Sequence, residues 1–354
     1  MQTWRLHPWP RFPHLYPFQA CSRLIIPFTM PIKSDLSLDS AKFLPTNATD
    51  PMRGLVEGLK NKSVPWPAVV HLAGASEVEI ASRDEGRTVP VRVLRPDNGK
   101  PSTGVFIHIH GGGWMTLSHQ DFDQRLQDCA NGVQMTVVSV GYRLAPTHPY
   151  PAAVHDCIDV AEYLVSDAGQ LQLGGGLLKA IGGESAGGHL AALTALHLAK
   201  NRPQAAAKLA GLVLIYGCYD LSLSMPSMVT SVPGSTALVD RDVMKACVDG
   251  FLPPSVATPE QRRAAEVSPL YEDLAGVAAK MPGGKLPPAL FLCGTADPLL
   301  DDTVFMSSKW MATGSEAVVK IFPGAPHAFD AFPSVVKEAG EALDITYQFL
   351  VARA

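Results

Sequence analysis

Short apolar runs alternate with helix-like segments from about residue 87 onward, and this alternation limits the possible folds more than any other feature. The runs are rich in β-branched or aromatic side chains and are bounded by Gly or Pro, as is typical of strands buried on both faces. Such alternation predicts an α/β protein with a mostly parallel central sheet and helices on both faces. The predicted strands are Thr88–Leu94, Gly104–His110, Met135–Val140, Leu177–Ile181, Gly211–Ile215, Ala289–Cys293 and Val318–Phe322, and the predicted helices are Asp121–Cys129, Ala152–Ser166, Ala186–Lys200 and Ser334–Ala352.

Two stretches interrupt the alternation. Residues 35–75 precede the first predicted strand, and residues from about 218 to 285 combine four methionines and several prolines with no strong strand pattern. A long insertion between core strands is often a lid or a binding segment. We expect residues 35–75 and about 218–285 to form a helical cap over a catalytic core of about 76–217 and 286–354.

The first 34 residues hold four basic side chains, no acidic ones and six prolines. They lack the uninterrupted apolar segment of a secretory signal peptide. We expect a disordered N-terminal extension on a cytoplasmic protein, with organellar targeting by this extension as the alternative and Met30 as a possible start. The six cysteines form no C-x-x-C pair, and we expect reduced thiols.

Charge and hydropathy exclude two classes of partner. The chain holds 29 basic and 33 acidic residues, for a net charge of −4, so it has no excess of cations for nucleic acid. No apolar run approaches the roughly 18 residues that would span a bilayer. We therefore expect neither nucleic-acid binding nor an integral membrane segment.

A sharp turn between strand and helix is indicated at Gly183-Glu-Ser185-Ala-Gly187. The sequence lies where the predicted strand Leu177–Ile181 meets the predicted helix Ala186–Lys200, and two further glycines flank it. The G-x-S-x-G pattern in this context is typical of a nucleophile elbow, whose small neighbours relieve crowding around an exposed serine. We predict that Ser185 is a nucleophile rather than a serine that merely forms a turn.

Three consecutive glycines follow another predicted strand, in His110-Gly-Gly-Gly-Trp114. Glycines at such a position leave backbone N–H groups free to point at a ligand, and a tetrahedral acyl intermediate needs fixed donors for its oxyanion. We predict that Gly111 and Gly112, with the N–H of Ala186, form an oxyanion hole. The alternative is a plain glycine-rich turn.

A serine hydroxyl needs a base to remove its proton, and in this kind of fold the chain order is serine, acid, histidine. His327 follows the predicted strand Val318–Phe322 and is the only histidine after residue 197. Asp297 follows the strand Ala289–Cys293, which favours it as the acid that orients His327. Asp301 and Asp302 are its rivals, but they stand near the start of a helix, where acids usually act as caps.

These motifs together resemble the hormone-sensitive lipase family of α/β-hydrolase serine esterases. The resemblance rests on HGGGW, GESAGG, Gly141-Tyr-Arg-Leu-Ala-Pro146 with Tyr150-Pro-Ala-Ala153, Asp297-Pro-Leu and His327-Ala-Phe, in family order over about residues 80–354. It implies an α/β-hydrolase fold, a carboxylesterase with a helical cap, and no metal or organic cofactor. It also implies a catalytic triad of Ser185, Asp297 and His327.

The sequence departs from the family pattern at two positions. Glu184 stands where the family usually has Asp, and Thr147 replaces the usual glutamate after Leu-Ala-Pro. Neither position belongs to the predicted triad. We expect both changes to affect tuning of the site, while the reaction is retained.

The predicted substrate is an uncharged small-molecule ester with a small to medium acyl chain or an aryl or alkyl group. We expect Trp114, Tyr142 and Met225 to line its pocket, and His108 and His189 to be structural. An acyltransferase or thioesterase acting on a biosynthetic intermediate would use the same triad. A third hypothesis, a non-catalytic protein that binds a small molecule, disagrees with the presence of His327. A homodimer is a family-level expectation.

Overall fold

One sheet of eight strands organises the described part of the chain. The computed structural model describes residues 51–172, 176–232 and 238–353. The strand order across the sheet is β1-β2-β4-β3-β5-β6-β7-β8. The strands are β1 (Ser76–Ala81), β2 (Thr88–Leu94), β3 (Val105–Ile109), β4 (Thr136–Val140), β5 (Leu178–Glu184), β6 (Gly211–Ile215), β7 (Ala289–Gly294) and β8 (Ala317–Phe322).

The sheet is mostly parallel, which confirms the predicted fold class. β1 pairs antiparallel with β2, and β2 pairs antiparallel with β4. Every other pairing, from β4 through β3 and β5 to β8, is parallel. The carboxyl ends of the parallel strands therefore meet at one edge, which is where open α/β sheets bind their ligands.

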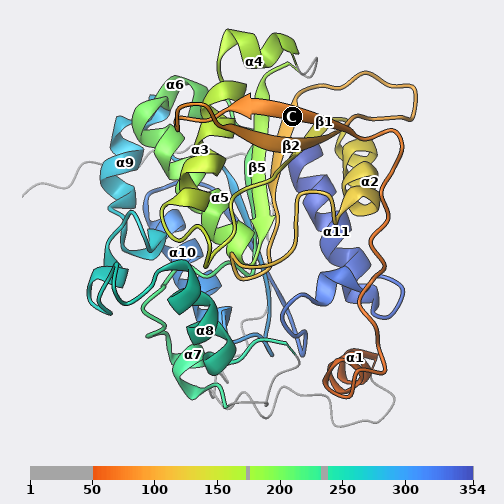
Figure 1. Ribbon diagram of the computed structural model, residues 1–354, viewed down its shortest axis with the longest axis vertical. Helices are drawn as coiled ribbons and strands as arrows, with labels where there is room; N and C mark the ends of the chain where they lie inside the picture. The colour runs from red at the N-terminus through yellow and green to blue at the C-terminus, as the bar shows by residue number, and fades with distance from the viewer. Residues whose placement is uncertain (1–50, 173–175, 233–237, 354) are drawn as a thin grey trace, which may run out of the picture. The chain divides into compact units, whose positions relative to one another are not determined.

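The central strands are buried on both faces because helices cover each side. All residues of β3, β4, β6 and β7 are buried, as their continuous apolar sequences predict. Successive residues of β3 point to opposite sides, so Phe106 joins one core cluster and Ile107 joins the other. Figure 1 shows the helices around the sheet.

The two core clusters receive different helices. The cluster that contains Ile107 takes the buried faces of α3 (Ala152–Leu164), α5 (Ala186–Asn201) and α10 (Leu300–Ala312). The cluster that contains Phe106 takes α1 (Pro51–Lys60), α2 (Asp123–Val133) and α11 (Lys337–Val351). Two short helices, α4 (Asp167–Gln172) and α6 (Pro203–Ala206), complete the helices between β4 and β6.

The long segment between β6 and β7 contains only helices and irregular chain in its described residues. Its helices are α7 (Pro226–Thr230), α8 (Arg241–Phe251), α9 (Leu274–Lys280) and the 3₁₀ turns η2 (Gln261–Arg263), η3 (Pro269–Tyr271) and η4 (Pro282–Gly284). The absence of strands agrees with the sequence pattern of about 218–285. The predicted N-terminal extension, residues 1–34, and residues 35–50 of the first predicted cap segment lie outside the described residues.

Strand β1 was not among the predicted strands. It lies at the edge of the sheet, and its side chains are exposed or half-buried except at Ile80. Glu77 and Glu79 point away from the core and give the segment a polar sequence with no apolar run. Within the described residues, no helix is long and apolar enough to cross a membrane.

Candidate active site

The predicted nucleophile elbow is a tight turn in the structure. Ser185 joins β5 directly to α5 and has φ 56° and ψ −120°, a left-handed conformation that is uncommon for a residue with a side chain. A Cβ added at Gly183 would lie 2.3 Å from the Ile109 carbonyl oxygen, and one at Gly187 would lie 1.9 Å from that same atom. The turn therefore packs against the end of β3 only if both positions are glycine.

Ser185, His327 and Asp297 form one hydrogen-bonded chain. The Nε2 atom of His327 lies 2.8 Å from Ser185 Oγ, and its Nδ1 atom lies 2.7 Å from Asp297 Oδ2. His327 and Asp297 are both buried. The second carboxylate oxygen of Asp297 accepts a hydrogen bond from the Leu299 N–H at 2.9 Å, which fixes the carboxylate plane. An imidazole in this position that carries its proton on Nδ1 would donate to Asp297 and present Nε2 to the serine hydroxyl.

The two rival aspartates are engaged elsewhere. Asp301 accepts a hydrogen bond from the backbone N–H of Ser227 at 2.7 Å. Asp302 accepts two, from the backbone N–H groups of Tyr219 and Asp220, at 2.5 and 2.7 Å. Burial raises the pKa of Asp302 well above its ordinary value. Both carboxylates thus attach α10 to the segment that follows β6 and leave Asp297 as the acid beside His327.

The glycine loop after β3 lies close to the nucleophile elbow. Gly112 has φ 97°, and a Cβ there would lie 2.3 Å from the Thr116 carbonyl oxygen. A Cβ on Gly111 would lie 3.4 Å from the Cβ of Ser185, so this loop passes close to the elbow. Ala186 is the first residue of α5, and its N–H has no acceptor within the helix. The role of these three N–H groups as oxyanion donors stays a prediction.

Tyr142 is hydrogen-bonded to the glycine loop. Its hydroxyl donates to the carbonyl oxygens of His110 and Gly111, at 2.9 and 3.0 Å. The Tyr142 ring stacks on the His110 ring with the centroids 4.2 Å apart, and His110 Nδ1 lies 2.9 Å from the Gly111 carbonyl oxygen. Burial lowers the pKa of His110 to about 4, so its ring is neutral near pH 7. These contacts turn the two carbonyl groups toward the tyrosine.

The other two predicted pocket residues have different surroundings. Trp114 is buried, donates from Nε1 to His189 Nδ1 at 3.2 Å, and stacks on Phe251 with ring centroids 4.8 Å apart. Met225 immediately precedes α7, is half-buried and packs against the core. The place of Trp114, Tyr142 and Met225 in a substrate pocket stays a prediction.

Glu184, the elbow residue before Ser185, forms a buried pair with His108 of β3. His108 Nε2 lies 3.1 Å from Glu184 Oε2, and His108 Nδ1 lies 3.0 Å from the Ser139 hydroxyl. The His108 ring is thus partnered by side chains of the neighbouring strands β4 and β5. Burial raises the pKa of Glu184, but the charges of His108 and Arg125 outweigh burial and lower it to about 2. The longer acid at this position thus remains ionised.

Three residues near the site carried no distinct signal in the sequence: Arg125, Tyr216 and Asp330. Tyr216 follows β6, and its ring centroid lies 4.6 Å from that of His327. Its hydroxyl donates to Asp330, which also accepts from Arg125 at 2.6 Å. Only the position of Asp330, three residues after His327, could have indicated a link to the triad. Among the described residues, no group of three or more His, Cys, Asp or Glu side chains is placed to hold a metal ion.

Comparisons with known proteins identify the family of the chain. A family model described as the alpha/beta hydrolase fold matches residues 106–331. The chain is 31% identical to an ethyl acetate hydrolase of Pseudomonas putida over 277 residues, which cover 78% of this chain and 81% of the relative. It is 32% identical to carboxylesterase NlhH of Mycobacterium tuberculosis over 255 residues, 72% of this chain and 75% of the relative.

A solved structure is similar over most of its length. The hyperthermophilic esterase from the archaeon Pyrobaculum calidifontis superposes with a TM-score of 0.68 at 27% identity, covering 88% of this chain and 94% of that structure. These comparisons indicate the same family as the sequence motifs. The chain belongs to the hormone-sensitive lipase-like esterase family of the alpha/beta hydrolase fold.

Proposed function

We propose that this carboxylic ester hydrolase works through an acyl-enzyme on Ser185, with His327 as its general base and Asp297 as the acid that orients His327. The observation that carries the proposal is the continuous chain of hydrogen bonds from Ser185 Oγ to His327 and on to Asp297, at 2.8 and 2.7 Å. A hydroxyl becomes a competent nucleophile at neutral pH when such a base is in contact with it.

The first half-reaction transfers the acyl group to the enzyme. His327 Nε2 takes the proton of Ser185 as Oγ attacks the ester carbonyl carbon, and the carbonyl oxygen becomes an oxyanion. The N–H groups of Gly111, Gly112 and Ala186 would stabilise this charge. His327 then gives the proton to the leaving alcohol as the C–O bond breaks, which leaves the acyl group on Ser185.

The second half-reaction uses water. His327 removes a proton from a water molecule that attacks the acyl carbon, and a second oxyanion forms in the same place. The proton returns from His327 to Ser185 as the carboxylic acid leaves. Asp297 stabilises the imidazolium that forms in each half-reaction and keeps Nδ1 protonated.

A small to medium acyl chain, or an aryl or alkyl ester, is the substrate class we propose. The name of the Pseudomonas putida relative, an ethyl acetate hydrolase, supports a short acyl group. The segment after β6 supplies apolar, adaptable side chains, including the predicted pocket residue Met225, which packs against the core.

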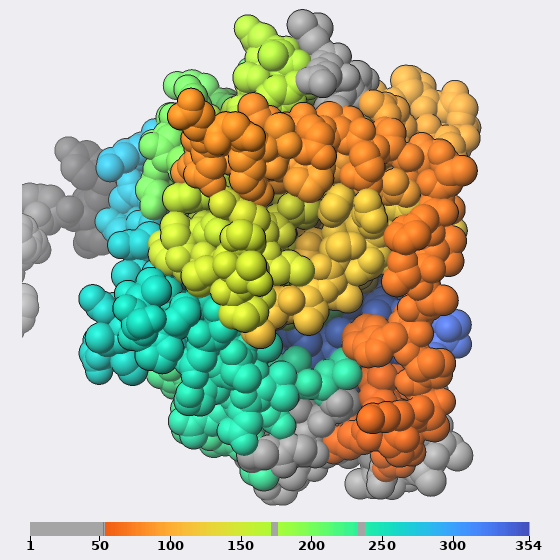
Figure 2. Space-filling view, in the orientation of Figure 1, coloured from red at the N-terminus to blue at the C-terminus, as the bar shows by residue number. Residues whose placement is uncertain are grey.

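We further propose that the described part of the first predicted cap segment, residues 51–75, and the segment of about 218–285 act as a cap over this site. The contact of α8 with the glycine loop supports this: a Cβ on Gly113 would lie 2.6 Å from Cys247 Sγ, and one on Gly250 would lie 2.7 Å from Met115 Sδ. Figure 2 shows the segment of α8, in teal, beside the yellow segment that follows β3. A substrate at Ser185 would thus be close to α8 as well as to the core.

Covalent labelling tests the acyl-enzyme directly. A fluorophosphonate forms a stable adduct with a serine only where a base activates the hydroxyl. We expect mass spectrometry to find the adduct on the peptide that contains Ser185 in wild type, slow labelling in His327→Ala, and no adduct in Ser185→Ala. Labelling of another serine, or none in folded wild type, would contradict the proposal.

The acyltransferase and thioesterase alternatives differ in the bond or the acceptor, and the same triad serves them. Supplying an alcohol acceptor with a p-nitrophenyl ester separates an acyltransferase from a hydrolase, and comparing an acyl thioester with the oxygen ester of the same acyl group tests for a thioesterase. We expect the free acid as the main product in water at neutral pH. A product dominated by the new ester would favour an acyltransferase instead.

A further inference from the structure

Asp330 ties the loop of His327 to two other elements of the fold. It lies in the 3₁₀ turn η5 (Phe329–Ala331), three residues after His327, and is almost fully buried. One carboxylate oxygen accepts a hydrogen bond from the Tyr216 hydroxyl, and the other accepts from Arg125 Nη2 at 2.6 Å. Each carboxylate oxygen therefore accepts a hydrogen bond from a different element.

Tyr216 contacts both the sheet and His327. It is the first residue after β6, has φ 36°, and donates from its backbone N–H to the Leu292 carbonyl oxygen at 2.7 Å. Its ring lies against the imidazole of His327, with the centroids 4.6 Å apart and the ring planes 57° from parallel. The Tyr216 ring thus packs against one side of the imidazole, and Asp330 accepts a hydrogen bond from its hydroxyl.

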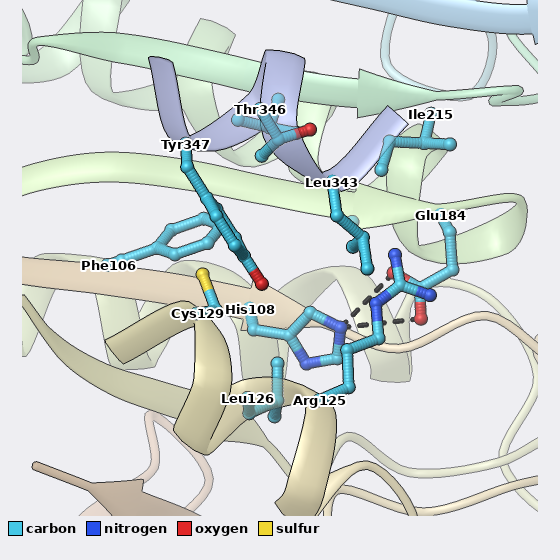
Figure 3. A pocket seen from close by; sticks show the side chains of 12 residues that line it. Phe106, His108, Arg125, Leu126, Cys129, Glu184, Ile215, Leu343, Thr346 and Tyr347 are labelled. Atoms are coloured by element: carbon cyan, nitrogen blue, oxygen red, sulfur yellow. Dashed lines mark hydrogen bonds and ion pairs between the residues drawn. The ribbon is translucent and has the colours of Figure 1, made fainter. Parts of the chain in front are cut away.

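Arg125 is the second partner of Asp330. It belongs to α2 and lines a cavity of about 30 Å³ together with His108 and Glu184, the residue before Ser185. In Figure 3 the guanidinium of Arg125 extends toward the Glu184 carboxylate, which is also bonded to His108. Burial would lower the pKa of Arg125, but Asp330 raises it above the ordinary value, so the guanidinium stays charged. The Arg125 cation therefore lies between two acids: Glu184, which precedes Ser185, and Asp330, which follows His327 by three residues.

We propose that Asp330 is a positioning residue of the esterase reaction, which anchors the His327 loop to Arg125 and holds the Tyr216 ring against the imidazole. Asp330 touches neither Ser185 nor Asp297, and it acts through the place it gives to His327. The proposal rests on the proposed role of His327 as general base.

The physical reason is the precision that proton transfer requires. His327 stands on a connection between β8 and η5, and its reach to Ser185 depends on where that connection lies. A misplacement of 1 Å can cost about 100-fold in rate, even when the reacting groups are all present. An ion pair that served stability alone would leave the rate unchanged in the molecules that remain folded.

Two substitutions remove the anchor in different ways. Asp330→Ala deletes both hydrogen bonds, and Tyr216→Phe deletes only the hydroxyl while it keeps the ring beside His327. Arg92→Gln is the matched control, because Arg92 pairs with the buried Asp123 at the start of the same helix α2, at 2.5 Å. Removing one partner of that pair leaves a buried carboxylate alone, so the control is expected to lose stability.

The measurement is kcat and KM for p-nitrophenyl butyrate at 25 °C, with folded protein verified by circular dichroism and melting. We expect Asp330→Ala to lower kcat by about tenfold or more with KM within about threefold. Tyr216→Phe should lower kcat by about threefold or more, and adding it to Asp330→Ala should cause little further loss, because its hydroxyl then has no partner. Arg92→Gln should lower the melting temperature and leave kcat within about twofold.

The opposite results overturn the proposal. A smaller loss of kcat in folded Asp330→Ala, or a loss matched by a rise in KM, would make Asp330 a structural residue. If Asp330→Ala does not fold, Tyr216→Phe decides by its own threshold. Wild type that hydrolyses no ester would instead contradict the proposed function, so the two failures are distinguishable.

Discussion

His327 Nε2 lies 2.8 Å from Ser185 Oγ, although 142 positions separate the two residues in the chain. The parallel sheet explains how they meet. Ser185 follows β5, Asp297 follows β7 and His327 follows β8, and the carboxyl ends of these strands lie at one edge of the sheet. A side chain placed just after any of these strands therefore faces the same site.

Replacing Asp297 by Asn should impair catalysis without removing the nucleophile. An amide at this position no longer selects the His327 tautomer that carries its proton on Nδ1, and the imidazolium loses its stabilising charge. We expect kcat to fall by about 10⁴-fold, while KM changes little. Steady-state hydrolysis of p-nitrophenyl butyrate measures both constants.

Asp301→Asn is the matched control for that experiment. Asp301 lies four residues away and accepts a hydrogen bond from the Ser227 N–H rather than from His327. Its replacement should leave kcat within about tenfold. Equal losses in the two variants would refute Asp297 as the orienting acid.

Gly112→Ala should disable the glycine loop. Gly112 has φ 97°, and a Cβ there would lie 2.3 Å from the Thr116 carbonyl oxygen, so the loop must shift. Loss of one correctly placed oxyanion donor costs about 10²–10³-fold in kcat. The check is kcat of the folded variant beside Gly340→Ala, a control in α11 where a Cβ meets nothing within 4 Å.

The control should behave in the opposite sense. Gly340 lies inside a helix, where Ala is favoured over Gly by about 1 kcal/mol, so Gly340→Ala should keep full activity and unfold at higher denaturant concentration. Full activity in Gly112→Ala as well would show that the loop does not supply the oxyanion donors.

The sequence was most informative where one short segment contains its own physical explanation. The elbow could be predicted because its glycines, the preceding apolar run and the following Ala-rich helix are all local, and the structure shows the clashes that exclude larger residues at Gly183 and Gly187. The chain order of acid and histidine after their strands likewise indicated Asp297 and His327, and in the structure Asp297 lies beside His327 and His327 beside Ser185. Their catalytic roles stay predictions that the variants above test.

Contacts that join distant segments could not be predicted in this way. Arg125 and Asp330 are 205 positions apart, and neither stands in a recognisable pattern. Strand β1 was missed because it is a partly exposed edge strand: Glu77 and Glu79 alternate with Val78 and Ile80, so it lacks the continuous apolar run by which the buried strands were recognised. The last helix was predicted to end at Ala352 and ends at Val351, whereas its predicted start, Ser334, was too early because the helix begins at Lys337.

Lowering the pH from 7.5 to 5 should destabilise the folded protein, although most carboxylates titrate only below pH 5. Burial lowers the pKa of His110 and of His189 to about 4, against 6.5 for an ordinary histidine. The unfolded chain therefore binds protons below pH 6.5 that the folded chain excludes down to about pH 4. The contribution of the neutral histidines to stability is present above pH 6.5 and is lost as the pH falls. The free energy of unfolding should decrease by about 2 kcal/mol per histidine between pH 7.5 and 5.

Urea denaturation at the two pH values measures this loss. His189→Gln should unfold with a smaller pH dependence than wild type, because one of the two titrating groups is gone. A wild-type stability that is flat from pH 7.5 to 5 would contradict the neutral, buried state of these rings.

The most direct test of the central claim is hydrolysis of p-nitrophenyl esters from acetate to palmitate by wild type and by Ser185→Ala. The account predicts turnover that is highest for short acyl chains and that falls by about 10⁶-fold when Ser185 is replaced. No turnover by folded wild type across the whole series, or a Ser185→Ala variant as active as wild type, would contradict an acyl-enzyme on Ser185.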